Sequence, residues 1–407
     1  MRALLVCALS VAVLAPSPVD AQPLALTEAD ALSRLDPGGP QLRALRARVD
    51  MARAEQLAAG RWPNPRVTFN REAVAGSTEH MFLVTQPLPI TGRRGLDVDA
   101  AVARVAASRN RADDRTRRLR TDVRLAFAGV WLAQTRQREL ARVRDQVQDL
   151  ATVLARREAA GDAAGFDRLR AEREALDLEA ERALAASDLT RAQSALVRLF
   201  ASPVDPATVD AVRPDVSRAA VPPLDVLMAR AEASRGELLA LERDLEAAGF
   251  ASRSAARRRV PEPELVAGSK SSSALGGDVG AVIALQATIP IFDRARPEQA
   301  LAAAQAAEAD AHAQAFRLAL RADLAALRSA VLERRSALDR YRTAAAASDE
   351  IERIARVTYD AGELGILELL DAHRTAAEAR IRQAVLDTAT WEAEIELEYV
   401  SGWEMPS

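Results

Sequence analysis

The stretch "EAAGDAAGFDRLRAERE" at residues 158–174 has a counterpart in "YDAGELGILELLDAHRT" at residues 359–375. At an offset of 201 residues, Gly161 falls on Gly362, and several positions that follow agree in type. The further matched pairs are Asp167 with Glu368, Leu169 with Leu370, Ala171 with Ala372 and Arg173 with Arg374. The agreement indicates that one stretch of chain occurs twice.

The same offset of 201 residues holds upstream, where Pro89 and Ile90 fall on Pro290 and Ile291. A repeat this long is a tandem duplication of one large unit and not a short-period solenoid. We therefore divide the chain into a first repeat (22–201), a Pro-rich linker (202–223), a second repeat (224–403) and a short tail (404–407).

The composition is typical of long helices, because 28% of the residues are charged and only 4% are aromatic. The formal net charge of −3 leaves no electrostatic footprint for nucleic acid. We interpret the arginine-rich runs at residues 115–120 and 257–259 as solvated helix faces.

Residues 1–21 have the pattern of an export signal, with Arg2, an apolar run and a small-x-Ala site that ends at Ala21. The only cysteine, Cys7, lies in this segment, so cleavage would leave no disulfide and no thiolate chemistry. Beyond it no stretch reaches the roughly 18 apolar residues that a membrane helix needs. Any membrane insertion would therefore use strands.

Proline placement predicts two long helical segments, because no proline lies between Pro89 and Pro203 or between Pro297 and Pro406. Each segment is broken once, at a glycine that can end a helix. We expect helical hairpins over about 91–201 and 293–400, with a first helix about 105 Å long. Their seams have coiled-coil spacing, with Leu140, Val143, Val147, Leu150 and Leu154 in the first and Leu324, Leu327, Val331 and Leu338 in the second.

Strand-like pairs precede both hairpins, at about 66–88 and 264–289, after short helices near the start of each repeat. The best alternating run spans 279–289, close to the roughly 9 to 11 residues of a tilted transmembrane strand. We expect Ile283 to face lipid and Ala284 to face the lumen. Soluble hairpins that cover the helices are an equally weighted alternative from alternation alone. A membrane location requires oligomerisation, since an open sheet edge is not tolerated in lipid.

The chain resembles the TolC-like outer-membrane efflux proteins, or outer-membrane factors, and within them the CzcC-like heavy-metal branch. The resemblance covers roughly residues 26–403 and rests on the order and spacing of several motifs. These are "LTEADAL", "AAGRWPNPRV", "QPLPITGRRGLDVDAA", "AAGDAAGFDRLRAE", "IPIFDRARPEQA" and "YDAGELGILELLDAHR". The motif "IPIFDRARPEQ" departs from the usual "PLFDRNQG", which affects the expected turn geometry.

The resemblance implies a mainly α fold with a small β part, in which long helical hairpins form a coiled-coil tunnel. It implies a homotrimer with four transmembrane β-strands per chain in a 12-stranded barrel, in the outer membrane of a Gram-negative bacterium. The tunnel would extend into the periplasm, with the linker at its equator. The implied partners are a periplasmic adaptor (membrane fusion) protein and an inner-membrane pump of the resistance-nodulation-division type.

The two duplicated turns are our candidate periplasmic gate and adaptor-docking site. The residues are Gly161, Asp162, Tyr359, Asp360, Gly362 and Glu363. Ordinary helix capping is the alternative for the same glycines and acids, and it does not conflict with a gate, because a tip must also be a good turn. Arg93, Arg94 and Arg294 are candidate anchors to outer-membrane lipid at the interface, with an intrachain salt bridge as the alternative.

The sequence favours no enzyme and implies no cofactor, because it has no nucleophile elbow or phosphate loop. The three histidines, His80, His312 and His373, form no cluster with metal-ligand spacing. A divalent metal cargo is implied by the resemblance alone. The sequence is also compatible with a drug or type I secretion duct and with a periplasmic coiled-coil tether that has no pore.

Overall fold

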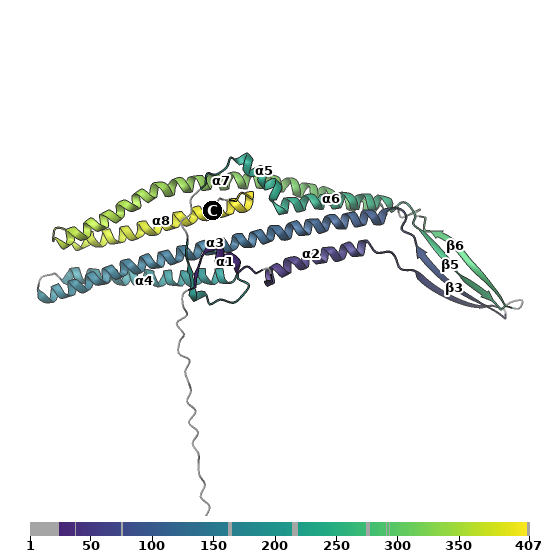
Figure 1. The fold of residues 1–407 in the computed structure, drawn as a ribbon, viewed down its shortest axis with the longest axis horizontal. Coiled ribbons are helices and arrows are strands. Elements are labelled where there is room, and N and C mark those ends of the chain that lie inside the picture. Colours follow the sequence, from purple (N-terminus) through teal and green to yellow (C-terminus); the bar gives the residue numbers. More distant parts are fainter. Residues whose placement is uncertain are drawn as a thin grey trace, which may run out of the picture.

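The computed structural model describes residues 24–36, 38–74, 76–161, 165–213, 219–273, 277–289, 291–292 and 294–404. Long helices run side by side along an elongated body, and a small sheet extends from one end (Figure 1). The prediction of a mainly α fold with a small β part is confirmed. No helix among these residues is long and apolar enough to cross a membrane.

The elements recur in the same order in the two halves, which confirms the internal repeat in three dimensions. The first half contains β1 (Leu24–Leu26), α1 (Glu28–Ser33), α2 (Pro40–Ala59), β2 (Arg66–Val74), β3 (Ser77–Pro87), α3 (Arg93–Ala160) and α4 (Gly165–Val197). The second contains η1 (Pro206–Thr208), β4 (Val209–Ala211), α5 (Leu224–Ser234), α6 (Gly236–Arg257), β5 (Pro263–Ser272), β6 (Asp278–Ala287), α7 (Arg296–Asp360) and α8 (Ile366–Ser401).

Two helical hairpins, α3 with α4 and α7 with α8, form the body. Helix α3 has 68 residues, which corresponds to about 100 Å, and α7 has 65. The predicted seam residues are at the helix contacts, since Val143 and Val147 are each 1% exposed and Leu324, Val331 and Leu338 are fully buried. The helices therefore associate through the apolar stripe that the spacing predicted.

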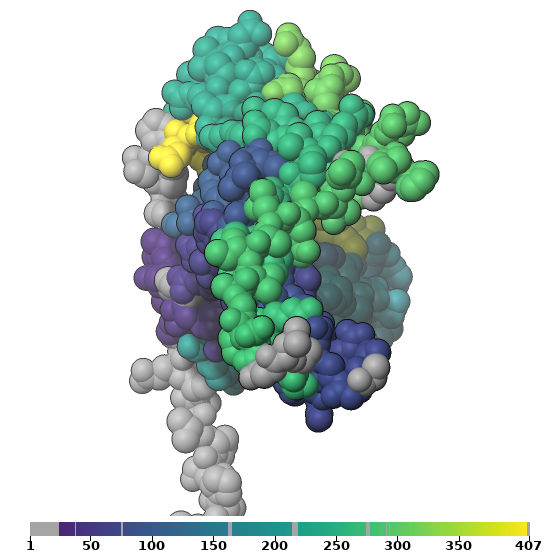
Figure 2. All heavy atoms as spheres, turned by 90° about the vertical axis from the view of Figure 1, so that its right-hand side faces the viewer, coloured from purple at the N-terminus to yellow at the C-terminus, as the bar shows by residue number. Residues whose placement is uncertain are grey.

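The four long strands form one antiparallel sheet in the order β2-β3-β5-β6. Figure 2 shows this sheet from its own end, with the helices behind it. The outer edges of β2 and β6 pair with no other described strand. Many large apolar side chains on the sheet are exposed, including Phe69, Val279, Ile283 and Leu285. An unpaired edge and an exposed apolar face require a further environment.

A second, parallel sheet joins β1 to β4 in the middle of the body, where Leu24 pairs with Val209. Leu26 and Val209 pack there into a core with Phe127 and Trp391, whose rings meet edge to face at 5.9 Å. This pairing ties the start of the described chain to the linker at residues 202–223. The sequence pattern gave no sign of it, because the two strands have three residues each.

Candidate functional site

Both hairpin turns lie at the same end of the body, opposite the sheet (Figure 1). The turn between α3 and α4 carries Gly161, and the turn between α7 and α8 carries Gly362. The structure thus brings together two turns that are 201 residues apart in the sequence.

Gly362 closes α7 with a complete Schellman motif. Its φ is +78°, and its amide donates to the Tyr359 carbonyl at 2.9 Å, while the Glu363 amide donates to the Thr358 carbonyl at 3.0 Å. A Cβ on Gly362 would meet no atom within 4 Å. The position therefore favours glycine for its backbone conformation and not for lack of space.

Gly161 ends α3 in the same left-handed conformation, with a φ of +83°. Its amide donates to the Glu158 carbonyl at 2.9 Å. Across the turn, the Arg168 guanidinium of α4 contacts the Glu158 and Glu172 carboxylates. Asp162, the next predicted gate residue, lies outside the described residues.

Tyr359 connects the two hairpins near their tips. Like Leu150 of α3, it packs against two apolar clusters behind the turns, one of which includes Val147 and Ile366 and the other Leu369. Burial raises the pKa of Tyr359, and charges on the first hairpin, Arg157 and Asp167, also act on it. Tyr359 is therefore a packing residue between the turns as well as a member of the duplicated motif.

Asp360 and Glu363 remain at the surface of the α7–α8 turn. Neither carboxylate forms an ion pair with another part of the chain that the structure describes. With Gly362 between them in the sequence, they make the tip an exposed acidic turn, with free carboxylates available to a partner.

An apolar cluster behind the tips holds the two hairpins together. It includes Val147 and Leu154 from α3, Ala171 from α4, and Ile366 and Leu370 from α8, all less than 9% exposed. The matched Leu169 is instead 57% exposed, so the repeat does not place equivalent side chains in equivalent surroundings.

Arg374 crosses from α8 to α4 just behind this cluster. Its guanidinium contacts the Glu174 carboxylate at 2.8 Å and the Glu181 carboxylate at 3.0 Å. In the repeat, Arg374 falls on Arg173, and the sequence pattern indicates no role for it. Its position opposite two glutamates can be recognised only when the packing of α8 against α4 is known.

His373 is buried beside Arg374, with 3% of its surface exposed. Its Nδ1 lies 2.9 Å from a Glu352 carboxylate oxygen of α7, and the same carboxylate contacts Arg380 and Gln146. Burial lowers the pKa of His373, although Glu352 opposes the shift. No group of three or more potential metal-ligating side chains exists in the described part of the chain.

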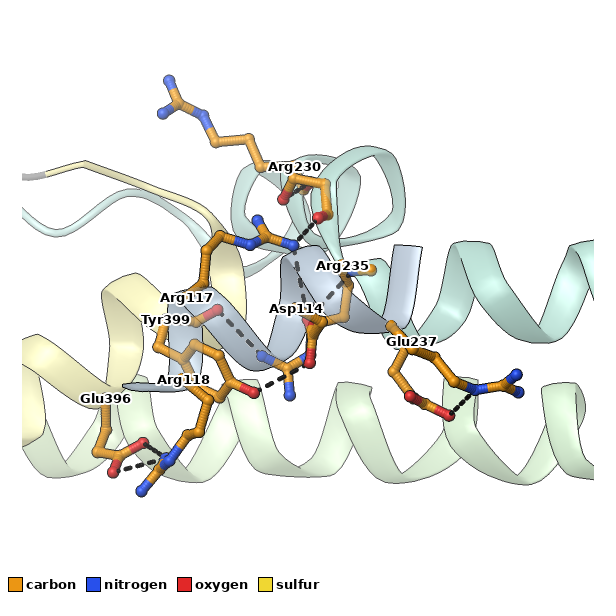
Figure 3. A network of polar contacts seen from close by, with 11 residues as sticks. Asp114, Arg117, Arg118, Arg230, Arg235, Glu237, Glu396 and Tyr399 are labelled. Carbon is orange, nitrogen blue, oxygen red and sulfur yellow. Dashed lines mark hydrogen bonds and ion pairs between the residues drawn. The ribbon is translucent and has the colours of Figure 1, made fainter. Parts of the chain in front are cut away.

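A second polar network joins the halves near the middle of the body (Figure 3). Asp114 of α3 is 8% exposed and accepts hydrogen bonds from the Gly236 amide at 3.2 Å and the Tyr399 hydroxyl at 3.1 Å. The Arg235 guanidinium stacks on the Tyr399 ring at 4.0 Å. A Cβ on Gly236 would lie 2.4 Å from the Asn110 carbonyl oxygen, so glycine allows α6 to approach α3.

The arginine run at residues 115–120 takes part in this network. Arg118 contacts Glu396 of α8 through both carboxylate oxygens, at 2.9 and 3.0 Å, and Arg117 donates to the Ser234 carbonyl. The expected solvated face is found for Arg115 and Arg120, which are exposed, whereas Arg117 and Arg118 are half-buried and also contact other helices. The sequence of an arginine-rich helix face does not indicate which arginines stay in solvent and which pair with another helix.

The predicted membrane anchors lie at the boundary between sheet and helices. Arg93 contacts the Glu262 carboxylate at 3.0 Å, and Arg94 donates to the Gly60 carbonyl and stacks on Trp62 at 5.6 Å. Arg294 is exposed and has no ion pair among the described residues. The first two thus make the intrachain contacts considered as the alternative, and the anchoring role stays a prediction.

Known proteins are similar to this chain along most of its length. The family model described as outer membrane efflux protein matches residues 227–402. The cobalt-zinc-cadmium resistance protein CzcC of Cupriavidus metallidurans is 27% identical over 361 residues, which is 84% of this chain and 81% of CzcC.

Two solved structures share the fold. A membrane protein from Pseudomonas aeruginosa superposes with a TM-score of 0.79 at 23% identity, over 92% of this chain and 93% of that one. The channel protein CusC superposes with a TM-score of 0.77 at 17% identity, over 93% of this chain and 92% of its own.

Proposed function

Because residues 227–402 match the outer membrane efflux protein family model and CzcC is similar over 84% of this chain, we propose that three copies of it form the exit duct of a tripartite efflux system. Proteins of this family are efflux channels of the outer membrane and not enzymes. The duct would passively conduct small substrates from a periplasmic adaptor and an inner-membrane pump of the resistance-nodulation-division type to the exterior. The main support for this proposal is the arrangement along the long axis of the molecule, with both hairpin turns at one end and an open-edged sheet at the other.

The sheet supports assembly into a closed ring. Its edge strands, β2 and β6, run in opposite directions, so β6 of one copy can pair antiparallel with β2 of the next. Unpaired backbone groups are costly in lipid, and closure removes both edges. Three copies would supply twelve strands, whereas one sheet of four is too narrow to close.

The helical hairpins support a long tunnel on the periplasmic side. At about 100 Å, α3 is far longer than a compact domain needs. With the linker at the equator, three copies would bring six hairpin turns to the entrance of this tunnel. Packed hairpins can switch between discrete arrangements, so small shifts at the turns would open or close the entrance.

The tips are the proposed gate and adaptor-docking site. Tyr359, Gly362 and Glu363 would meet the adaptor, while Asp162 and Asp360 would add charge around the entrance. Joint replacement of Asp162 and Asp360 by alanine should loosen the entrance and raise sensitivity to large antibiotics such as vancomycin. Unchanged sensitivity in a strain with normal trimer levels would remove the acids from the gate.

Divalent metal cations are the proposed cargo. The support is the similarity to CzcC, whose name specifies resistance to cobalt, zinc and cadmium. A duct need only conduct such ions, so it requires no tight binding site. The test is export in a strain that lacks this chain, measured across metals and drugs. Loss of metal export alone supports the proposal, whereas selective loss of drug export would assign the chain to multidrug efflux.

The arginines at the sheet boundary are proposed to anchor the duct in outer-membrane lipid. Arg93 and Arg94 begin α3 after the connection from β3, and Arg294 lies between β6 and α7, at the level where phospholipid headgroups would lie. Replacement of Arg93 and Arg94 by glutamate should lower membrane insertion and leave helix content unchanged. Insertion at the wild-type level would contradict the anchoring role.

A further inference from the structure

We infer that a second copy of the chain inserts Trp62 against a pocket formed at the end of β6. The pocket has a volume of about 460 Å³ and lies at the boundary between sheet and helices. Arg258, Val260, Ile289, Phe292 and Glu298 are among the residues that line it. This inference rests on the proposed trimer and identifies a contact that the single chain leaves incomplete.

The pocket wall carries apolar surface that no described part of the same chain covers. Phe292 is 97% exposed, Ile289 is 70% exposed and Ile291 is 61% exposed. Large apolar groups in adjacent positions, set beside arginines and a glutamate, are typical of a protein interface and not of a solvated loop.

Sheet topology determines which segment of a second copy reaches the pocket. The strand ends nearest the helices are in register, since Arg66 pairs with Thr85, Pro87 with Glu264, and Pro263 with Ala287. If β6 of one copy pairs antiparallel with β2 of the next, the residues before 66 lie beside those after 287. Segment 61–65 of the second copy therefore meets the pocket-lining residues Thr288, Ile289, Ile291 and Phe292.

The arriving segment is suited to this contact. Trp62 is 57% exposed, and the Arg94 guanidinium covers one side of its ring at 5.6 Å, which leaves the other side open. Pro63 and Pro65 restrict the backbone that follows, so little conformational entropy is lost on docking. An aromatic side chain held in this way is a typical interface anchor.

The charges on the two sides are also complementary. Arg61 is exposed and forms no ion pair with the described part of its own chain. On the pocket wall, Glu298 contacts Arg258 through one carboxylate oxygen, at 3.2 Å, and its side chain remains 37% exposed, so a second cation can reach it. Arg61 of the second copy would bring a donor to this carboxylate.

Cysteine pairs test the contact directly, in a Cys7→Ser background that leaves no native thiol. Trp62→Cys combined with Phe292→Cys should give disulfide-linked dimers and trimers after mild oxidation of outer membranes, because each partner lies on a different copy. Each single variant should give no ladder. The matched control, Trp62→Cys with Val153→Cys near the hairpin tip, should also remain unlinked, since Val153 is exposed but far from the sheet.

Because loss of two aromatic side chains can itself weaken assembly, Asn64→Cys with Ile291→Cys provides a second pair that keeps both aromatic residues. A native gel without oxidant separates the outcomes. A trimer that neither pair can cross-link would overturn this contact, as expected if a lipid headgroup fills the pocket, and would leave the proposed duct intact. The absence of any trimer, even for the wild-type chain, would overturn both.

Discussion

Gly362→Val perturbs the proposed gate at one backbone position. Gly362 has a φ of +78° and lies within two backbone hydrogen bonds of 2.9 and 3.0 Å. A β-branched residue in this conformation costs about 1–3 kcal/mol. Loss of either hydrogen bond adds about 1 kcal/mol. Because an added Cβ meets no atom within 4 Å, no steric contact with the rest of the chain contributes.

The total free-energy cost of Gly362→Val is therefore about 2–4 kcal/mol, and it destabilises the turn alone. Each 1.4 kcal/mol is a factor of about ten, so the native turn loses about 30-fold to several hundred-fold in population relative to its alternatives. Helices α7 and α8 are packed together by buried residues such as Leu324 and Leu338, which lie far from the turn. We therefore expect trimers to assemble normally while export is lost.

The assay compares metal export from preloaded cells with the trimer level in their outer membranes. Gly362→Asn should retain more export than Gly362→Val, because asparagine tolerates the left-handed conformation. Gly129→Ala is the matched control. Gly129 lies inside α3 with open space around it, so alanine should stabilise the helix by about 0.5–1 kcal/mol and leave export unchanged. A Gly362→Val trimer that is well expressed and exports at the wild-type rate would refute the role of this turn.

Three further changes test other parts of the molecule. Asp114→Ala leaves the largely buried Arg235 guanidinium without its carboxylate and should lower the free energy of unfolding by about 3–5 kcal/mol, seen as a lower melting temperature. Asp145→Ala, at a more exposed pair, should lower the free energy of unfolding by at most about 1 kcal/mol. Equal losses of stability would contradict the network. Because burial lowers the pKa of His373, the folded chain binds fewer protons than the unfolded chain as pH falls below the usual 6.5. Wild-type melting temperature should therefore fall between about pH 7.5 and 6 more steeply than that of His373→Gln, and parallel curves would contradict the shift. Ile283→Arg should cost about 2–4 kcal/mol and reduce the trimer if this side chain faces lipid, and an equal trimer yield for Ala284→Arg would count against that orientation.

The long elements could be predicted from the sequence because their signals are local. The spacing of Val143, Val147 and Leu154 predicts a seam, and these side chains are buried. The breaks at Gly161 and Gly362 follow from the conformational freedom of glycine, and both residues have a positive φ. Such features depend on residues within a few turns of one another.

The contacts that tie the halves together could not be predicted, because they depend on tertiary packing. In the sequence, Asp114 and Arg118 are indistinguishable from other charged positions on a helix. Their partners lie on α6 and α8, which pack against α3 only in the folded chain. The same holds for His373, whose buried pairing with Glu352 requires α7 and α8 in register. A single sequence holds no signal for which charges on a long helix become enclosed.

The mass of the complex extracted from outer membranes, measured by native mass spectrometry, tests the central claim most directly. A duct closed by the edge strands β2 and β6 predicts three copies of the mature chain in the outer-membrane fraction, with little monomer or dimer. Recovery of the chain as a monomer or dimer in the periplasmic fraction would contradict the account, because four strands cannot close a ring on their own, and would favour a tether that has no pore.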